Sequence, residues 1–315
     1  MDRIGKESGT KGFVFVGAGY SSLQTNMVAE VGGTEVSDKR IDSLQGGADD
    51  KEYVGVAPAF NVTYTFAGPR TQLFAGVELE DFLTQDGALG FGVRQGIGSL
   101  GIVRASLLAS IPLKVWKDPY LTNVDRSSTD RTGFGVRLGW EHIFESDLDL
   151  TLTTRSIELE DERSGQTNGL TESQRQLLYR EGDINKLEVS YTWIPSPHHV
   201  IQPGIVWIDH DLDGDAMAMD GYSAKLSYAY LGLSKVEFLV NLLAGKMESD
   251  TYNPIFAKKE EVDRLGGSIT MTYVEPFGMK NWRARAVAST GGEDSNIDFY
   301  DMSVNAFSIG ALYNF

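Results

Sequence analysis

The chain has 315 residues, 41% of them apolar, with a formal net charge of −16 and no cysteine. This length allows one large β domain or two ordinary ones. No window approaches the roughly 18 uninterrupted apolar residues of a membrane-spanning helix, which excludes a helical membrane protein. The acidic balance argues against nucleic acid as a partner, because phosphate contacts need a basic surface.

The N-terminus contains no apolar segment typical of a signal peptide. The absence of cysteine suits the oxidising periplasm and cell surface. Either the protein is cytosolic or its signal peptide has been removed, and the pattern of the last residues, described below, favours the second. Residues 1–10 are expected to form a periplasmic N-terminal segment of a single domain over residues 1–315.

Apolar and polar residues alternate with a period of two along much of the chain, which indicates β-strands with one apolar face. In residues 60–66, phenylalanine, valine and tyrosine alternate with asparagine and threonine. A soluble β-sandwich has the same alternation. The pattern recurs in residues 73–80, 134–141, 188–193, 224–230, 236–242, 268–273, 282–286 and 307–315.

The connections between these segments favour a membrane barrel over a sandwich. Short connections are expected at residues 67–70, 98–100, 145–147, 195–199, 231–234 and 275–279. Long ones are expected at residues 24–52, 113–130, 160–183 and 250–263, with shorter ones near 84–87, 211–220 and 290–300. Short turns on one side and long loops on the other match the periplasmic and extracellular ends of an outer-membrane barrel.

Aromatic residues also gather at the strand ends, where interfacial girdles of membrane barrels lie. We predict an all-β fold, a transmembrane antiparallel up-and-down β-barrel of about 14 strands with both termini inside. About 12 strands is the alternative, because residues 148–159 lose their alternation near Ser156 and the register of residues 12–23 is ambiguous.

Ionisable residues on the polar strand faces are expected to line the lumen. Charge in a barrel interior requires water or an opposite charge. The set therefore indicates either a wet channel or ion pairs that brace the wall, and the sequence leaves both open. Its members are Glu78, Glu80, Arg94, Arg104, Arg137, Glu141, Arg155, Lys186, Glu188, Lys225, Glu237, Arg283 and Arg285.

Trp116 and Tyr120 flank Pro119 where a strand gives way to an outward loop. We place this aromatic pair at the mouth of the barrel. It is expected to act either as a stacking platform for a solute or as an anchor at the membrane interface.

Acidic residues concentrate in the predicted extracellular segments 30–52, 158–183, 209–220 and 293–301. Within residues 209–220, the acidic residues have the spacing of a calcium-binding loop. This makes Ca²⁺ a candidate ligand, although no cofactor is required. His210 lies within this segment and raises the alternative of a surface hydrolase, but no second catalytic pair is found and we expect no enzyme. The candidate calcium ligands are Asp209, Asp211, Asp213, Asp215 and Asp220.

The last nine residues alternate and end on an aromatic residue, with Phe307, Ile309, Tyr313 and Phe315 on the apolar face. This resembles the C-terminal recognition signal of Gram-negative outer-membrane barrels. The resemblance implies the barrel assembly machinery, outer-membrane lipid and lipopolysaccharide as partners.

Several runs are similar to a proteobacterial outer-membrane family catalogued only as a domain of unknown function. The resemblance implies a barrel in the outer membrane and transfers no functional residues. The runs are residues 7–22, 70–74 with 79–83, 92–95, and 115–121 with 124–126.

Two functions are compatible with these features of the chain. The first is a porin-like channel for passive diffusion of small hydrophilic solutes through a mixed-charge lumen. Its acidic mouth predicts a weak cation preference that fades as salt screens the charge. The alternative is a closed structural or surface-interaction barrel whose acidic loops bind divalent cations.

Overall fold

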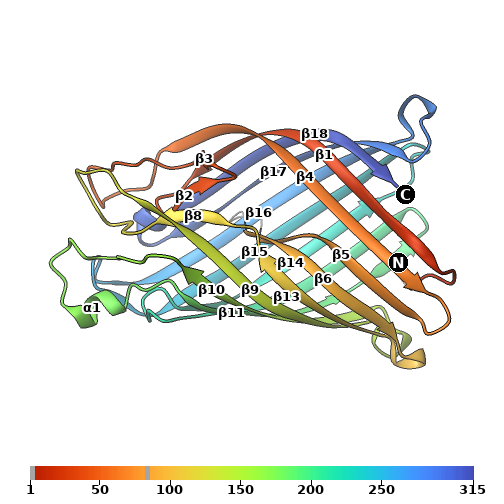
Figure 1. The fold of residues 1–315 in the computed structure, drawn as a ribbon, viewed down its shortest axis with the longest axis horizontal. Helices are drawn as coiled ribbons and strands as arrows, with labels where there is room; N and C mark the ends of the chain where they lie inside the picture. Colours follow the sequence, from red (N-terminus) through yellow and green to blue (C-terminus); the bar gives the residue numbers. More distant parts are fainter. Residues whose placement is uncertain (1–3, 82–85) are drawn as a thin grey trace.

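The computed structural model describes residues 4–81 and 86–315, apart from the side chains of residues 79–81 and 86. Over this part of the chain, none of the helices has the length and apolar character needed to cross a membrane. Long strands dominate the described structure and tilt steeply around a common axis, as Figure 1 shows.

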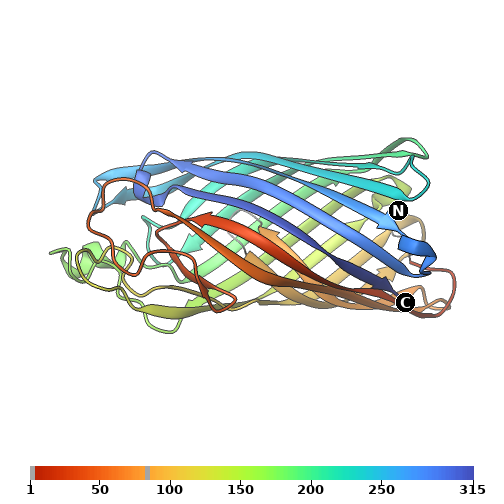
Figure 2. The ribbon, with the colours of Figure 1, turned by 90° about the horizontal axis from the view of Figure 1, so that it is seen from above.

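Fourteen long strands of the described chain form the wall of an antiparallel barrel (Figure 2). Each wall strand pairs with the next one along the chain, and the first pairs with the last, which closes the ring. The prediction of a 14-stranded barrel is confirmed, and the 12-stranded alternative is wrong. The wall strands are β1 (Gly9–Gln24), β4 (Asp50–Phe66), β5 (Thr71–Asp81), β6 (Asp86–Gly96), β7 (Ile102–Ser110), β9 (Ser128–Glu141), β10 (Leu148–Leu159), β11 (Gly182–Tyr191), β13 (His199–Leu212), β14 (Met219–Tyr230), β15 (Val236–Asn253), β16 (Lys258–Val274), β17 (Trp282–Ser295) and β18 (Met302–Asn314).

The two ends of the barrel differ. Both termini and the short turns lie at one end, here called the turn end, and the long loops lie at the other, the loop end (Figure 1). The loop end carries short elements: β2 (Val28–Val31), β3 (Thr34–Glu35), β8 (Leu113–Trp116), α1 (Glu172–Gln176) and η4 (Asp298–Tyr300). The turn end carries β12 (Trp193–Ser196), η1 (Gly98–Leu100), η2 (Ile143–Glu145) and η3 (Pro276–Gly278).

One predicted loop is largely strand. The sequence pattern predicts a loop over residues 250–263, but β15 continues to Asn253 and β16 begins at Lys258. Exposed ion pairs join the two strands in this region: Lys246 lies 2.7 Å from Asp263, and Lys259 pairs with Glu248. Such cross-strand pairs stabilise a regular ladder in water, so charged residues here extend the strands.

The outward face of the wall is apolar over a limited height. On β16, Leu265, Ile269, Met271 and Tyr273 are exposed on this face. The eight steps from Leu265 to Tyr273 span about 26 Å, or about 20 Å after a tilt of ~40°, close to the ~25 Å apolar band of outer-membrane barrels. A closed barrel with such a band spans the outer membrane, because no edge is left unpaired in lipid.

Above this band, toward the loop end, the outward face of the wall becomes polar and the inward face becomes apolar. On β10, Thr154, Ser156 and Glu158 point outward, while Ile157 and Leu159 are buried inside. The alternation of β10 therefore continues, and its apparent loss in the sequence marks the level at which the apolar face changes sides. The strands project beyond the lipid, where water favours a polar exterior and an apolar interior.

Candidate functional site

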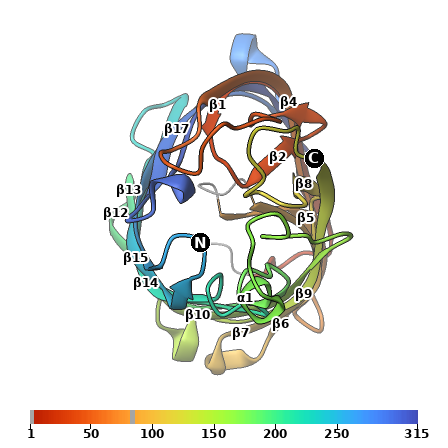
Figure 3. The ribbon, with the colours of Figure 1, turned by 90° about the vertical axis from the view of Figure 1, so that its left-hand side faces the viewer.

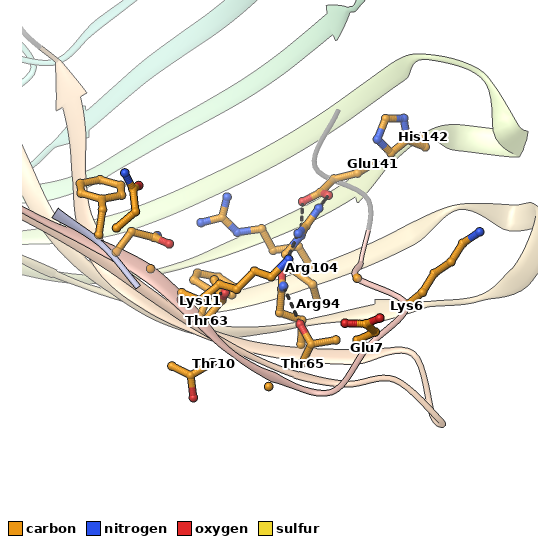
Figure 4. Close-up of a pocket in the computed structure, with 18 of the residues that line it drawn as sticks. Lys6, Glu7, Thr10, Lys11, Thr63, Thr65, Arg94, Arg104, Glu141 and His142 are labelled. Atoms are coloured by element: carbon orange, nitrogen blue, oxygen red, sulfur yellow. Dashed lines mark hydrogen bonds and ion pairs between the residues drawn. The ribbon is translucent and has the colours of Figure 1, made fainter. Parts of the chain in front are cut away.

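The turn end of the lumen is a wide polar cavity of about 1160 Å³, here called the vestibule (Figure 4). Residues 5–12 lie along it, so the N-terminal segment folds against the lumen. Two hydrogen bonds hold this segment: the Arg70 guanidinium donates to the Gly5 carbonyl at 3.3 Å, and the Ala67 amide donates to the Ser8 hydroxyl at 3.0 Å.

Charged side chains of the vestibule form ion pairs that span neighbouring strands. The carboxylate of Glu78 on β5 pairs with both Arg104 on β7 and Arg137 on β9. Arg94 on β6 reaches Glu141 on β9, with its Nε 3.1 Å from the carboxylate (Figure 4). Because the wall is concave, long side chains converge inside it and can bypass the nearest strand, so these pairs brace the barrel around a water-accessible space.

Further up, the lumen holds a middle cavity of about 370 Å³, lined by Ser227, Asn241, Ser268 and Ser289 together with charged groups. The Lys225 ammonium lies 2.9 Å from the Glu188 carboxylate across the intervening strand β13. This mixture of hydroxyl, amide and paired charged groups offers both donors and acceptors to a solute.

The ionisable residues expected in the lumen take several positions along it. Glu237 and Arg283 pair at 2.7 Å, Arg155 donates to the Ser110 hydroxyl at 3.2 Å, and Arg285 lies above the Phe13 ring. The side chain of Glu80 is outside the described part of the structure. The others line the cavities or join the ion pairs above: Glu78, Arg94, Arg104, Arg137, Glu141, Lys186, Glu188 and Lys225.

The loop end of the lumen is different in chemistry. It holds a cavity of about 260 Å³, here called the loop-end chamber, whose walls are methionine, valine, isoleucine and leucine with a few charged groups. Five of the eight methionines of the chain line it: Met27, Met217, Met219, Met247 and Met302. Reasoning from the sequence missed these residues. The change of apolar face within each strand is the signal that could have found them.

A hydrophobic cluster of the loops, here called the cap, lies above this chamber. Six of the loops send residues into one buried cluster, and Figure 3 shows these loops crossing the mouth. Its buried members are Tyr120, Leu178, Ala216, Ile297, Phe299 and Tyr300. Met27, Met217 and Tyr300 belong both to the cap cluster and to the chamber wall, so the cap is the chamber's roof.

Buried hydrogen bonds stabilise the cap. The Tyr120 and Tyr300 hydroxyls lie 2.6 Å apart, and the Asn253 amide donates to Tyr300 at 2.7 Å. Burial raises the pKa of both tyrosines above the ordinary value. Arg126 donates to the carbonyls of Asn26 at 3.0 Å and Pro119 at 3.1 Å, and burial lowers its pKa to about 10.

The aromatic pair expected at the mouth needs a correction. Trp116 and Tyr120 lie at the loop end, but they are only 1% and 0% exposed, and Tyr120 belongs to the cap. The Trp116 indole donates to the Ser37 hydroxyl at 2.8 Å and stacks under the Arg126 guanidinium at 4.4 Å. Neither side chain faces lipid, and neither offers an open surface for stacking, because the loops fold over them.

The acidic segment 209–220 does not curl into a calcium loop. Asp209 and Asp211 lie on the extended part of β13 and point outward, while His210 between them points into the loop-end chamber. Asp213, Asp215 and Asp220 are also exposed, and within the described residues no three acidic or histidine side chains are grouped to hold a metal. Neighbours in a strand face opposite sides, so His210 and its two chain neighbours Asp209 and Asp211 point to different faces of the wall.

The apolar residues of the chain end lie on the outward face of β18. Phe307, Ile309, Tyr313 and Phe315 are all exposed there. Tyr313 packs against Trp282 with ring centroids 5.1 Å apart, as expected in an aromatic girdle at the turn end. The function of these residues as an assembly signal stays a prediction.

No curated protein matches the sequence. Among solved structures, the outer membrane channel DcaP of Acinetobacter baumannii is similar, with a TM-score of 0.47, 10% identity and coverage of 98% of both chains. The Ralstonia pickettii toluene transporter TbuX has a TM-score of 0.48 and 11% identity, over 98% of this chain and 89% of its own. Likenesses at this level carry no information about what this chain does.

The family comparison is more direct. The model of the family described as protein of unknown function (DUF2860) matches residues 9–314, from the first wall strand to the last. The chain belongs to this family.

Proposed function

We propose that this barrel is a channel through which small solutes cross the outer membrane passively. The observation that carries the proposal is that the lumen is a series of cavities from the turn end to the loop end, of about 1160, 370 and 260 Å³. Lys186 and Arg264 line both upper cavities, so these two cavities adjoin. A barrel built only as a scaffold gains stability by filling such space.

The cap makes the proposed channel a gated one. Its buried aromatic residues pack together over the chamber, so we propose that a solute enters when the loops move. Lid openings of this kind occur on timescales of microseconds to seconds. We expect brief openings, in contrast to the steady current of an open general porin.

Planar-bilayer recording with a matched pair of variants tests the pathway. Ser289 faces the middle cavity, and the next residue, Thr290, is exposed on the outward face. Ser289→Trp should reduce the single-channel conductance severalfold, whereas Thr290→Trp should leave it unchanged. Equal conductance in both variants, or no conductance in the wild-type protein together with no uptake of small solutes into liposomes, would reject the proposal.

Selectivity follows from the charge distribution. The acidic loops surround the mouth, so we expect a weak preference for cations in dilute KCl. This preference should disappear near 1 M, where the Debye length falls to about 3 Å. Reversal potentials in KCl gradients measure it, and firm anion selectivity would contradict the assignment of the mouth.

A closed structural barrel is the second candidate, favoured by the cap and by the paired lumenal charges. It predicts that planar bilayers containing the protein show no ion conductance, even when a substitution weakens the packing of the cap. We also propose lipid, lipopolysaccharide and the barrel assembly machinery as partners, and no enzymatic role. Wild-type surface hydrolysis that is lost in a His210→Ala variant would overturn that last point.

A further inference from the structure

The loop-end chamber is a preformed apolar space beneath the cap. Its methionines are flexible and polarisable, which suits a surface that adapts to a small apolar molecule. Val262 and Met247 lie in a buried cluster of its wall with Val206 and Ile208, so the wall is ordered and the space is not an effect of loose packing. A cavity lined largely by apolar side chains can bind the apolar part of a small molecule.

The volume sets the size of the ligand. An engineered apolar cavity of about 150 Å³ holds benzene. The chamber, at about 260 Å³, therefore has room for a molecule with roughly ten heavy atoms. This is the size of a medium-length alkyl chain or of an aromatic ring with a short side chain.

The charged groups that line the chamber favour an anionic end. Four lysine and arginine side chains line it against two glutamates, and Arg180 pairs with Glu162 behind the wall at 2.6 Å, which leaves an excess of one positive charge. Lys186 and Arg264 lie at the junction with the middle cavity and form its floor. The Arg264 guanidinium pairs with Glu293 at 2.8 Å, and the buried Glu260 carboxylate accepts from Ser295 at 3.0 Å, so both acids already have donors.

We infer that the loop-end chamber binds a small amphipathic carboxylic acid of about ten heavy atoms, with its hydrocarbon part among the methionines and its carboxylate at the Lys186–Arg264 floor. The inference rests on the proposed function and deepens it by naming the class of solute. A molecule held there has its polar end directed to the middle cavity, which is the next polar space on the path to the turn end.

Methionine-methyl NMR of the barrel in lipid nanodiscs tests binding without requiring transport. The five chamber methionines report on the site, while Met279 in a turn and Met271 on the lipid-facing wall serve as internal controls. Octanoate should shift the chamber signals in a saturable way and leave Met279 unchanged. A shift at Met271 alone that grows linearly, with the chamber signals unmoved, reports partition into lipid and contradicts the inference.

Two comparisons establish the role of the charge. 1-Octanol should bind at least tenfold more weakly than octanoate, and Lys186→Met should weaken octanoate binding about tenfold while leaving 1-octanol unchanged, as expected for one charge-assisted hydrogen bond. Lys246→Met removes an exposed charge on the outward face, next to the chamber residue Met247, and should change neither. Val262→Trp should abolish the shifts by filling the chamber; Lys186→Met keeps the test valid if that variant does not fold.

Absence of saturable shifts at the chamber methionines, or equal binding of octanoate and 1-octanol, would overturn the inference. A protein that conducts ions but gives either result remains a channel with a different solute. Conversely, specific octanoate binding in a barrel that never conducts would reject the proposed channel function and support the binding site.

Discussion

Phe299 is the residue through which the cap can be tested most directly. Its ring is 1% exposed and lies 5.5 Å from the rings of both Tyr120 and Phe256, and 5.4 Å from that of Tyr300. Phe299→Ala removes these contacts and leaves a cavity, which costs about 3 kcal/mol in a buried cluster. This free energy is lost from the packed arrangement of the loops, because the wall strands are held separately by their inter-strand hydrogen bonds.

A cost of about 3 kcal/mol corresponds to a shift of roughly a hundredfold in the ratio of open to closed channels. Single-channel recording of the open probability measures this shift directly. Phe134→Ala is the matched control, because Phe134 is 57% exposed on the lipid-facing wall and lies far from the cap cluster. An unchanged open probability in Phe299→Ala, with the variant correctly folded, refutes the cap as a gate.

Three further predictions address stability, pH and assembly. Glu78→Gln leaves two arginines without their shared carboxylate and should lower the free energy of unfolding by about 2 kcal/mol in urea, with an exposed-site control, Glu261→Gln, unchanged. Burial raises the pKa of Tyr120 and Tyr300 above the ordinary tyrosine value, so the cap should be fully stable below pH ~10 and lose stability as the pH rises further. Absorbance measured during alkaline titration should show two late-titrating tyrosines, and these should be missing when both are replaced by phenylalanine. Phe315→Ser should reduce the fraction of folded barrel on heat-modifiability gels, whereas Phe315→Tyr should not; equal yields would reject an assembly role for the terminal ring.

The membrane-embedded wall was predictable because lipid imposes one rule on every strand. Outward residues there must be apolar, so the alternation at residues 60–66 and 307–315 identified the strands and their number. The inward direction of the ionisable residues followed from the same rule. Their partners did not follow, because Glu78 meets Arg137 only through the curvature of the closed wall.

The loop end escaped prediction for a different reason. The cap joins residues from six loops that are far apart in the sequence, such as Tyr120 and Tyr300, and no local pattern records such contacts. Trp116 followed by Pro119 indicates the end of a strand, but this pattern is the same whether the indole faces lipid or is buried, as it is here. Only the tertiary packing of the loops decides between these environments.

The two levels of the wall also bear on the choice of solute. In the lipid-embedded half, the interior is free to be wet, and it contains the vestibule with its ion pairs. In the projecting half, water surrounds the exterior, so the same strands turn their apolar side inward and create the chamber. Moving an uncompensated polar group into such a space costs about 2–7 kcal/mol. A strongly hydrated solute therefore meets its main barrier directly under the cap, whereas an amphipathic one meets a binding site there and a polar path beyond it.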